Sequence, residues 1–568
     1  MHIDIVPNRN SPPAILLRES YREGAKVRKR TLANLSALSA EQVDAIRRTL
    51  RGEKLVPVAE LFAIVRSFHH GHVLAVLSAM KQLGFESLVG SRPSRERSLI
   101  MAMVTARILE PTSKLATTRW WRTTTVPAVF DCQDADEDDL YAALDWLITR
   151  QEHIEKKLAA RHLEEGGLVL YDLTSSYFEG KTCPLALLGH NRDGKKGKLQ
   201  VNYGLLTDPK GRPVAVSVFE GNTGDPKTLL PQVAKLQKTF AIEALVLVGD
   251  RGMISQKQIN ELKQRDGIAW ITALRTGAIR KLVDDGHIQL GLFDERNLFE
   301  VAHPDFPGER LVACRNEDLG RLRAHKRQSL VKATFIGLEK VRGMVSRGKL
   351  KGKDAIGVRI GKVVDKYKVA KHLVLDIRDD GFDFHLDDDK VSEEASLDGI
   401  YVVRTSVPAQ RLATDDVVRS YKMLSQVERA FRSLKTIDLK VRPIRHRLEQ
   451  RVKAHIFLCM LAYYVTWHMT EAWRPLLFCD EDQEGKKTRD PVAPAKRSLA
   501  ALDKVHSKVL ENGSTVHSFQ TLLKDLSTIV RNVCRRPGAS ADEPSFEVLT
   551  SPSPTQQRAY DLLSSIRV

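Results

Sequence analysis

Two apolar runs, each interrupted or ended by one aspartate, limit most strongly what this chain can fold into. LVLYDLTSS (residues 168–176) contains Asp172, and ALVLVGDRG (244–252) ends its apolar part at Asp250. Short runs rich in Leu and Val predict buried β-strands. A carboxylate inside such a strand is costly unless it is paired or binds a metal ion. Asp250 ends its strand, where α/β folds commonly place active groups.

Each aspartate also has a purely structural interpretation. Ser175, Ser176 or a backbone turn would satisfy the Asp172 carboxylate. Asp250 precedes a predicted helix, and aspartates often cap helices. The sequence leaves these interpretations open for each residue alone, and the functional one gains weight from the combination with a third acid.

The third acid is Glu428, in YKMLSQVERAFRSLK (421–435), whose spacing predicts a helix. Tyr421, Glu428 and Lys435 are seven residues apart and therefore share one helical face, which Arg432 adjoins. An acid flanked by a phenol and two cations suits a metal ion bound beside a nucleic-acid phosphate. The alternative is a solvated helix with ordinary ion pairs.

Composition narrows the class of protein. A formal net charge of +18 and a pI near 9.5 favour a polyanionic partner such as nucleic acid. The six cysteines form no C-x-x-C pair, which argues against a zinc ribbon or a disulfide framework. The N-terminus lacks the apolar core of a signal peptide, and HIFLCMLAYYVTW (455–467) is too short for a membrane span. We expect a soluble intracellular protein whose 455–467 segment is a buried helix.

A length of 568 residues predicts two to four domains. Ser39 and Gln42 predict a capping box at the start of a helix. Apolar spacing predicts helices across 55–165, including VAELFAIVRSF (58–68), and three strands followed by β-α units from Gly167 onwards. The segments expected are 1–54, basic strands and a helix; 55–165, helical and either DNA-binding or a helical bundle without DNA contact; 166–275, first part of an α/β core; 276–397, a partly β insertion; 398–475, second part of the core; and 476–568, a linker and C-terminal tail.

Charged clusters outside the three acids are less specific. Lys349, Lys351 and Lys353 in the insertion are candidate phosphate contacts, although charge runs are usually solvated faces. Lys195, Lys196 and Lys198 are expected at the tip of a hairpin.

The helix around Glu428 resembles the Y-x2-R-x3-E-x6-K signature of DDE transposases from bacterial insertion sequences, the "IS four" group. Tyr421, Glu428 and Lys435 occupy signature positions, while Leu424 stands where the signature has arginine; Arg419 and Arg432 are candidate substitutes. The segments YDLTSSYFEG (171–180), VLVGDRGM (246–253), HNRDGKKGKLQVNYGLLTD (190–208), EGNTGDPKTL (220–229) and RPIRHRLEQRVKAHIFLCMLAYY (442–464) also resemble these transposases. The resemblance covers residues 15–475.

The resemblance implies an α/β fold with an RNase H-like core, namely a mixed five-stranded sheet with flanking helices, beside a helical N-terminal domain and a partly β insertion. It implies that Asp172, Asp250 and Glu428 are catalytic and hold two Mg²⁺ ions, with Mn²⁺ as a substitute. Tyr421, Lys435, Arg432 and Arg419 would contact DNA. The implied partners are double-stranded transposon ends and target DNA, bound by a homodimer in a synaptic complex in the bacterial cytosol and nucleoid.

The implied reaction is hydrolysis at the terminal inverted repeats of the element, followed by strand transfer without a nucleotide cofactor. Two other functions remain open from the residues alone. One is an RNase H-like nuclease or resolvase that cuts without joining. The other is a DNA-binding regulator whose three acids are structural.

Overall fold

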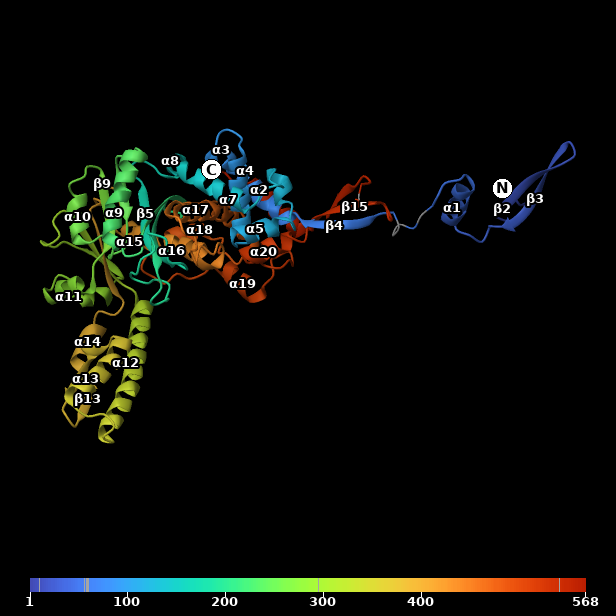
Figure 1. The fold of residues 1–568 in the computed structure, drawn as a ribbon. Coiled ribbons are helices and arrows are strands. Elements are labelled where there is room, and N and C mark those ends of the chain that lie inside the picture. Colours follow the sequence, from blue (N-terminus) through green and yellow to red (C-terminus); the bar gives the residue numbers. More distant parts are fainter. Residues whose placement is uncertain (10, 56, 58–60, 295, 541, 568) are drawn as a thin grey trace. The chain divides into compact units, whose positions relative to one another are not determined.

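The computed structural model of the protein describes residues 1–9, 11–55, 57, 61–294, 296–540 and 542–567 (Figure 1). The chain divides into two compact units. The small unit contains Met1–Phe68 and Val530–Thr550, and the large unit contains His69–Ile529 and Ser551–Val568. Each unit therefore combines segments that are far apart in the sequence.

The small unit begins with an antiparallel sheet of β1 (His2–Val6), β2 (Ala14–Glu23) and β3 (Lys26–Asn34). Helix α1 (Ala40–Leu50) follows. Its predicted capping box is confirmed, because the side chains of Ser39 and Gln42 each accept a hydrogen bond from the other residue's backbone N–H.

The prediction of a helix over 58–68 is wrong for the described residues, because Ala63–His69 form strand β4. Residues 58–60 lie outside the described residues. β4 belongs to a second sheet, of order β16-β15-β4, with β15 (Val530–Arg535) and β16 (Phe546–Leu549). The branched side chains of Ile64 and Val65 favour a strand. The partner strand comes from the far end of the chain, so local spacing does not reveal it.

The large unit opens with a helical part, as predicted, which begins at residue 71. Its helices are α2 (Gly71–Gln82), α3 (Phe85–Val89), α4 (Arg95–Leu109), α5 (Lys114–Trp121), α6 (Val126–Phe130), α7 (Glu137–Thr149) and α8 (Gln151–His162). Helix α17 (Glu449–Ala472) packs against α2, α4 and α7, and also against the central sheet. This position explains why the 455–467 run is apolar on every side, and the predicted buried helix is confirmed. Within the described residues, no helix combines the length and the apolar character needed to cross a bilayer.

The centre of the large unit is a mixed sheet of eight strands in the order β10-β11-β14-β9-β8-β5-β6-β7. Strands β5, β8 and β9 are parallel to one another, and the remaining neighbours are antiparallel. The strands are β5 (Leu168–Tyr177), β6 (Gln200–Thr207), β7 (Pro213–Glu220), β8 (Leu245–Val248), β9 (Ile268–Ala273), β10 (Leu298–Val301), β11 (Arg310–Arg315) and β14 (Ile400–Thr405). The connecting helices are α9 (Asp225–Ala234), η2 (Lys235–Thr239) and α10 (Gln256–Leu262).

The sheet is mixed, as expected, but it has eight strands where five were predicted. β10 and β11, which were predicted to lie in the insertion, extend the central sheet through β14. Leu311, Val312, Ala313 and Cys314 are fully buried, so β11 has the apolar character of a central strand. The strand was not recognised from the sequence because its apolar run is short and the residues around it are charged and follow no regular pattern.

The part that leaves the sheet between β11 and β14 is mainly helical and contains one β-hairpin, which agrees with the partly β character expected for the insertion. It contains α12 (Glu317–Ser346), α13 (Lys353–Tyr367), η4 (Ala370–His372), the hairpin of β12 (Leu373–Ile377) and β13 (Phe382–Leu386), and α14 (Asp388–Ala395). Before it, α11 (Thr276–Asp284) and η3 (Leu290–Asp294) pack near the β10 edge. Leu338 and Val341 of α12 share a separate small core with Ile356 and Ile360 of α13. Figure 1 shows α12, α13 and α14 grouped together, away from β5 and α17.

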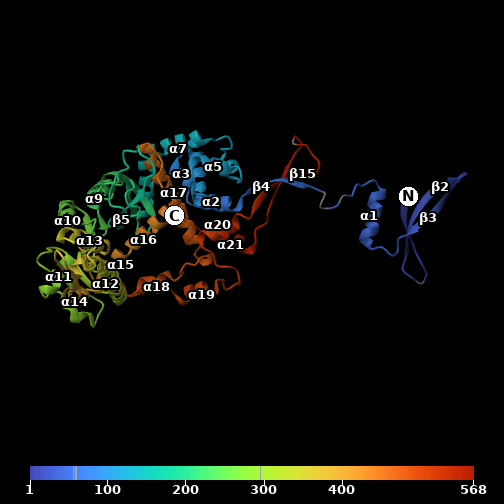
Figure 2. The same ribbon diagram turned by 60° about the horizontal axis from the view of Figure 1, so that its bottom comes forward.

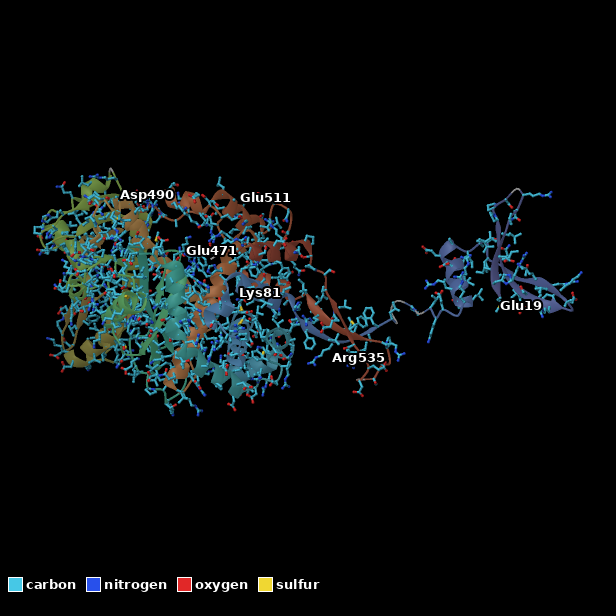
Figure 3. All side chains as sticks on the ribbon, turned by 90° about the horizontal axis from the view of Figure 1, so that it is seen from above. Glu19, Lys81, Glu471, Asp490, Glu511 and Arg535 are labelled. Carbon is cyan, nitrogen blue, oxygen red and sulfur yellow. The ribbon has the colours of Figure 1, made fainter. Side chains whose placement is uncertain are left out.

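Residues after α17 do not form one tail. Helices η6 (Arg474–Leu476), α18 (Gln483–Thr488), α19 (Leu499–Ser507), α20 (Phe519–Leu526) and α21 (Pro554–Ser564) belong to the large unit. Asp490, labelled in Figure 3, accepts a hydrogen bond of 2.9 Å from Asn297, just before β10. α20 and α21 pack against α2 (Figure 2), because Leu522 and Leu563 need an apolar partner surface. The predicted linker and tail are thus parts of the fold.

Candidate active site

Asp172 lies in β5, at a point where the strand is buried among its neighbours. Its Oδ1 accepts a hydrogen bond of 2.8 Å from the N–H of Leu173. The two serines considered as partners for this carboxylate bind other groups. Ser175 Oγ accepts from the N–H of Arg192 at 3.3 Å, and Ser176 Oγ lies 2.9 Å from the Tyr203 hydroxyl.

Asp250 lies directly after β8, beside Asp172. β5 and β8 are parallel, and Leu170 of β5 pairs with Val248 of β8. Asp172 and Asp250 each follow two residues later, so they lie next to each other. The Asp250 Oδ1 accepts hydrogen bonds from the N–H groups of Gly252 and Met253, at 3.0 and 2.8 Å. Asp250 does not cap the following helix, because α10 begins at Gln256 with Ser255 as its N-cap; its hydrogen bonds instead close a turn that fixes the direction of the carboxylate.

Glu428 is carried by an interrupted helix rather than a regular one. α15 (Thr414–Lys422) and α16 (Leu424–Arg432) meet at Met423, and a wider π-helical turn, η5 (Ser433–Ile437), follows. Val427, Ala430 and Phe431 form the buried stripe of α16. Leu424 extends this stripe towards the core, which explains physically why an apolar residue occupies the arginine position of the signature.

The buried stripe places α16 over the face of the sheet that carries Asp172. The Phe431 ring meets the Tyr203 ring edge-on, with centroids 5.9 Å apart. Tyr203 pairs with Thr174, which is on the same face of β5 as Asp172. Glu428 flanks the stripe and is exposed. The structure thus brings the strand acids and the helix acid to one face.

Electrostatic interactions also link the three acids. The pKa of Asp172 is raised to about 7, first by burial and then by the charges of Asp250 and Glu428, whereas the Leu173 N–H and Arg192 act to lower it. The pKa of Tyr421 is also raised, first by burial and then by Asp250, Glu428 and Asp172. Tyr421 therefore keeps its proton near neutral pH and lies within the field of all three acids.

The chemistry of this donor set fits a hard divalent cation, because three carboxylates supply only oxygen ligands. A bound cation would also relieve the unfavourable burial of Asp172 beside two other acids. In the described part of the chain, no three His, Cys, Asp or Glu side chains are close enough together to hold a metal ion as they stand. Metal binding here therefore requires at least one of the acidic side chains to turn towards the others.

The remaining predicted site residues lie at different places. Lys435 is in η5, and its Nζ lies 2.8 Å from Asp193 Oδ1. Arg419 binds Asp416 and the carbonyl of Arg489, at 2.8 and 3.0 Å. Arg432 is exposed on α16, whereas Lys349, Lys351 and Lys353 are exposed at the turn between α12 and α13.

Sequence reasoning missed the residues that surround Lys435. Asp193 binds Lys435 and Arg442, while Arg192 binds Asp225 and acts on Asp172. The available signal was a single acid inside the basic loop HNRDGKKGK (190–198), in which the lysines are more conspicuous.

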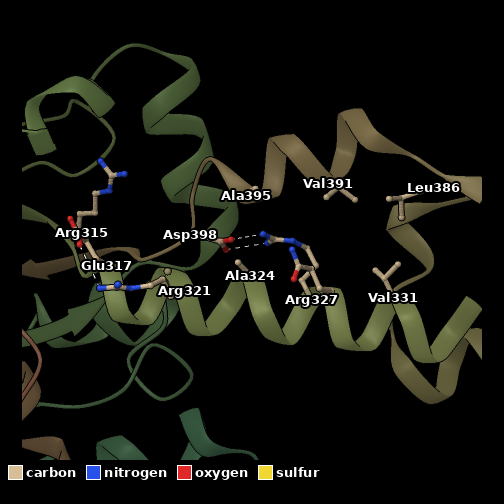
Figure 4. A pocket seen from close by; sticks show the side chains of 12 residues that line it. Arg315, Glu317, Arg321, Ala324, Arg327, Val331, Leu386, Val391, Ala395 and Asp398 are labelled. Atoms are coloured by element: carbon tan, nitrogen blue, oxygen red, sulfur yellow. Dashed lines mark hydrogen bonds and ion pairs between the residues drawn. The ribbon is translucent and has the colours of Figure 1, made fainter.

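A cavity of about 680 Å³ lies elsewhere, between α12 and α14 (Figure 4). Its lining includes Arg327, whose Nη1 is 3.1 Å from Asp398 Oδ1. None of the three acids lines this cavity, so it is distinct from the candidate active site.

Two strand acids and one helix acid on a mixed sheet are the arrangement expected for the DDE class of enzymes, and residues 169–465 match the family model of the transposase DDE domain. Because this match spans more than half of the chain, the protein belongs to the DDE transposases, which act on DNA and use divalent metal ions. Residues 3–56 also match the N-terminal domain of IS1634 family transposases. The protein is thus an insertion-sequence transposase, as the sequence predicted.

No relative was found among curated proteins. Among solved structures, the chain is similar to the piggyBac transposase in a synaptic complex with hairpin DNA, at 11% identity over 80% of this chain and 77% of that one, with a TM-score of 0.32. A likeness of this degree establishes no shared function.

Proposed function

We propose that the protein binds the terminal inverted repeats of its insertion sequence, cleaves the DNA there with Asp172, Asp250 and Glu428, and transfers the freed strand to target DNA. The catalytic domain would be RNase H-like, with two Mg²⁺ ions, or Mn²⁺ in their place, held by these acids. The observation that supports this proposal most directly is that Asp172 is largely enclosed and lies close enough to Asp250 and Glu428 to feel their charges.

When bound, two such ions supply an activated nucleophile and stabilise the leaving oxygen. The chain supplies the geometry. Asp172 is fixed by its strand and Asp250 by two backbone hydrogen bonds, while Glu428 is exposed on α16 and can turn to complete the set. Tyr421 retains its phenolic proton and can donate a hydrogen bond to a phosphate oxygen near the acids.

DNA would be held by cations around and beyond the acids. We assign phosphate contacts to Lys435 and Arg432 near the site, with Arg419 oriented by Asp416. Lys349, Lys351 and Lys353 would contact DNA further along, from the turn between α12 and α13. Because transposition joins two ends of one element, we propose that the protein acts as a homodimer in a synaptic complex.

The test is Asp172→Asn, which preserves size and removes the carboxylate charge. Binding to end DNA should survive, because the cations are untouched, while Mg²⁺-dependent cleavage should fall by at least about a thousandfold, an order of magnitude typical for removal of one catalytic group. The measurement is single-turnover cleavage of a labelled duplex that carries the inverted repeat. Equal cleavage by variant and parent would refute the assignment.

Strand transfer needs its own assay. Pre-cleaved ends supplied with a target plasmid should give joined products with the parent and none with Asp172→Asn. Cleavage without any joining by the parent would restrict the activity to that of a nuclease.

A further inference from the structure

Asp193 connects three separate segments next to the candidate active site. Its side chain is only 2% exposed. Oδ2 accepts a hydrogen bond of 3.0 Å from the N–H of Tyr177, the last residue of β5. Oδ1 binds Lys435 Nζ at 2.8 Å, at the end of the helix that carries Glu428, and it also binds the guanidinium of Arg442.

The loop that carries Asp193 lies along the second half of β5. The Arg192 N–H donates to Ser175 Oγ, three residues after Asp172, and the Arg192 side chain binds Asp225 at the start of α9. Asn191 Oδ1 accepts hydrogen bonds from the N–H groups of Asp193 and Lys195, at 2.9 and 3.0 Å. The direction of the Asp193 carboxylate is therefore fixed by the loop itself.

The segment with Arg442 is fastened to the same strand end. The Ile444 N–H donates to the carbonyl of Tyr177 at 3.1 Å, and the Glu179 N–H donates to the carbonyl of Ile444 at 2.9 Å. The backbone segments that carry the two cations are also joined to each other, since the Val441 N–H donates to the carbonyl of Leu434 at 2.9 Å, and the Asp193 carboxylate binds both side chains.

The charges in this cluster do not balance. Lys435 and Arg442 share one carboxylate oxygen. The pKa of Lys435 is lowered mainly by burial, and the nearby charge of Arg192 lowers it further by a smaller amount. Asp193 alone thus faces two cations, Lys435 and Arg442, because Arg192 is paired with Asp225 and also acts on Asp172. The Lys435 and Arg442 side chains are 10% and 23% exposed, so their atoms reach solvent only in part. A partly buried cation whose charge is not fully compensated favours binding of an anion. Beside a transposase site, the available anion is a DNA phosphate.

We propose that Asp193 is a positioning residue that holds Lys435 and Arg442 side by side as a two-cation site for one backbone phosphate of the DNA strand entering the active site. The same carboxylate fixes η5, and with it α16, against the end of β5. This inference rests on the proposed function, since it takes DNA cleavage by the three acids as given, and it adds Arg442 as a DNA contact and Asp193 as the group that aligns both cations.

The test is Asp193→Asn, which still accepts the Tyr177 hydrogen bond but lacks the charge. DNA affinity should stay within about threefold of the parent or rise, because net positive charge increases. Single-turnover cleavage at saturating DNA should fall by about 10- to 100-fold, since small displacements of positioned groups cost that much.

The matched control is Asp208→Asn. Asp208 is equally buried at 2% and also binds an arginine, Arg212, together with backbone N–H groups, but it does so at the β6–β7 turn. Asp208→Asn should lower thermal stability and leave the cleavage rate of the folded protein unchanged. If Asp193→Asn behaves in the same way, its role is merely structural and the inference is wrong.

Two cation variants keep the inference testable if Asp193→Asn does not fold. Lys435→Met and Arg442→Met should each weaken end binding and reduce the slope of log affinity against log salt by about one. In the Lys435→Met background, Asp193→Asn should cost less than about threefold further, because the two residues act as a pair. Unchanged salt slopes for both variants would overturn the two-cation site.

The outcomes also separate this inference from the proposed function. If Asp172→Asn still cleaves, the catalytic assignment fails. If Asp172→Asn is inactive and Asp193→Asn cleaves at the parental rate, only the positioning role fails.

Discussion

At the scale of single residues, the ion-free site is destabilised by its own acids. Asp172 is half-buried in its strand, and Asp250 and Glu428 make its ionisation still less favourable. A carboxylate in this environment is held ready for a cation at a cost to the stability of the fold. That cost is measurable without any DNA.

Stability of the metal-free protein should fall with rising pH. The folded pKa of Asp172 is about 7, against about 3.9 in an unfolded chain. Between these values the folded state holds a proton that the unfolded chain has released, so raising the pH favours unfolding until the pH passes about 7. At about 1.4 kcal/mol per pKa unit, the effect from pH 5 to pH 8 is at most about 3 kcal/mol. The measurement is denaturant unfolding of parent and Asp172→Asn in the presence of a chelator.

Asp172→Asn should lack this component and become relatively more stable at pH 8 than at pH 5. Adding Mg²⁺ should stabilise the parent at pH 8 more than the variant. A stability difference between the two proteins that does not change with pH would show that Asp172 titrates normally.

The placement of the three acids and Tyr421 in the fold was predictable from sequence, because each has a local pattern: a strand run, a strand end or a helical spacing. Asp193 was not. Its partner Lys435 lies 242 residues further along the chain, and no window around a polar loop contains that pairing. The predicted alignment of Lys435 with Glu428 was also affected by the π turn of η5, which the seven-residue spacing does not reveal.

At the scale of elements, the hairpin of α12 and α13 concentrates positive charge. Residues 317–368 contain 15 Lys or Arg and 5 Asp or Glu, whereas residues 369–398 contain 3 and 10. The basic part ends in the exposed turn with Lys349, Lys351 and Lys353. Such separation within one small subdomain favours a single basic side that meets DNA.

Replacing Lys349, Lys351 and Lys353 together by Gln should weaken binding to end DNA and reduce the salt slope by up to about three, one for each phosphate that the lysines no longer neutralise. Fluorescence anisotropy over a series of salt concentrations gives both quantities. Asp388→Asn with Asp389→Asn, exposed on the acidic α14, is the control and should weaken nothing. A salt slope equal to that of the parent would mean that these lysines are only solvated.

Elements with a strong period were predicted well, such as the helices of the N-terminal part and strand β5. The errors fall on short elements whose partners are distant. β4 was taken for a helix because its sheet is completed by β15, and β10 and β11 were assigned to the insertion because only β14 makes them part of the central sheet. In each case tertiary pairing, not local propensity, decides the structure.

At the scale of the whole molecule, the first and last helices of the large unit share one core. Tyr560 of α21 donates a hydrogen bond of 3.0 Å to the carbonyl of Gly71, and the Trp473 indole donates one of 2.9 Å to the carbonyl of Ala559. Leu563 is fully buried where these helices meet. The end of the chain therefore holds the helical part together, although its sequence resembles a polar tail.

Leu563→Ala should destabilise the large unit by about 2–5 kcal/mol, the usual range for a buried leucine, and should lower the Tm measured by calorimetry. Leu499→Ala is the control, because Leu499 is 86% exposed, and its effect should be within about 0.5 kcal/mol. Equal Tm values for the two variants would show that α21 does not support the unit.

The insertion leaves and rejoins the sheet at one place, since Arg315 at the end of β11 pairs directly with Ile400 at the start of β14. The insertion therefore connects two adjacent antiparallel strands of the sheet, as the turn of a β-hairpin does. A lineage could therefore lengthen, shorten or exchange this module without disturbing the strands that hold the acids. Recognition of new DNA could evolve there while the chemistry stays the same.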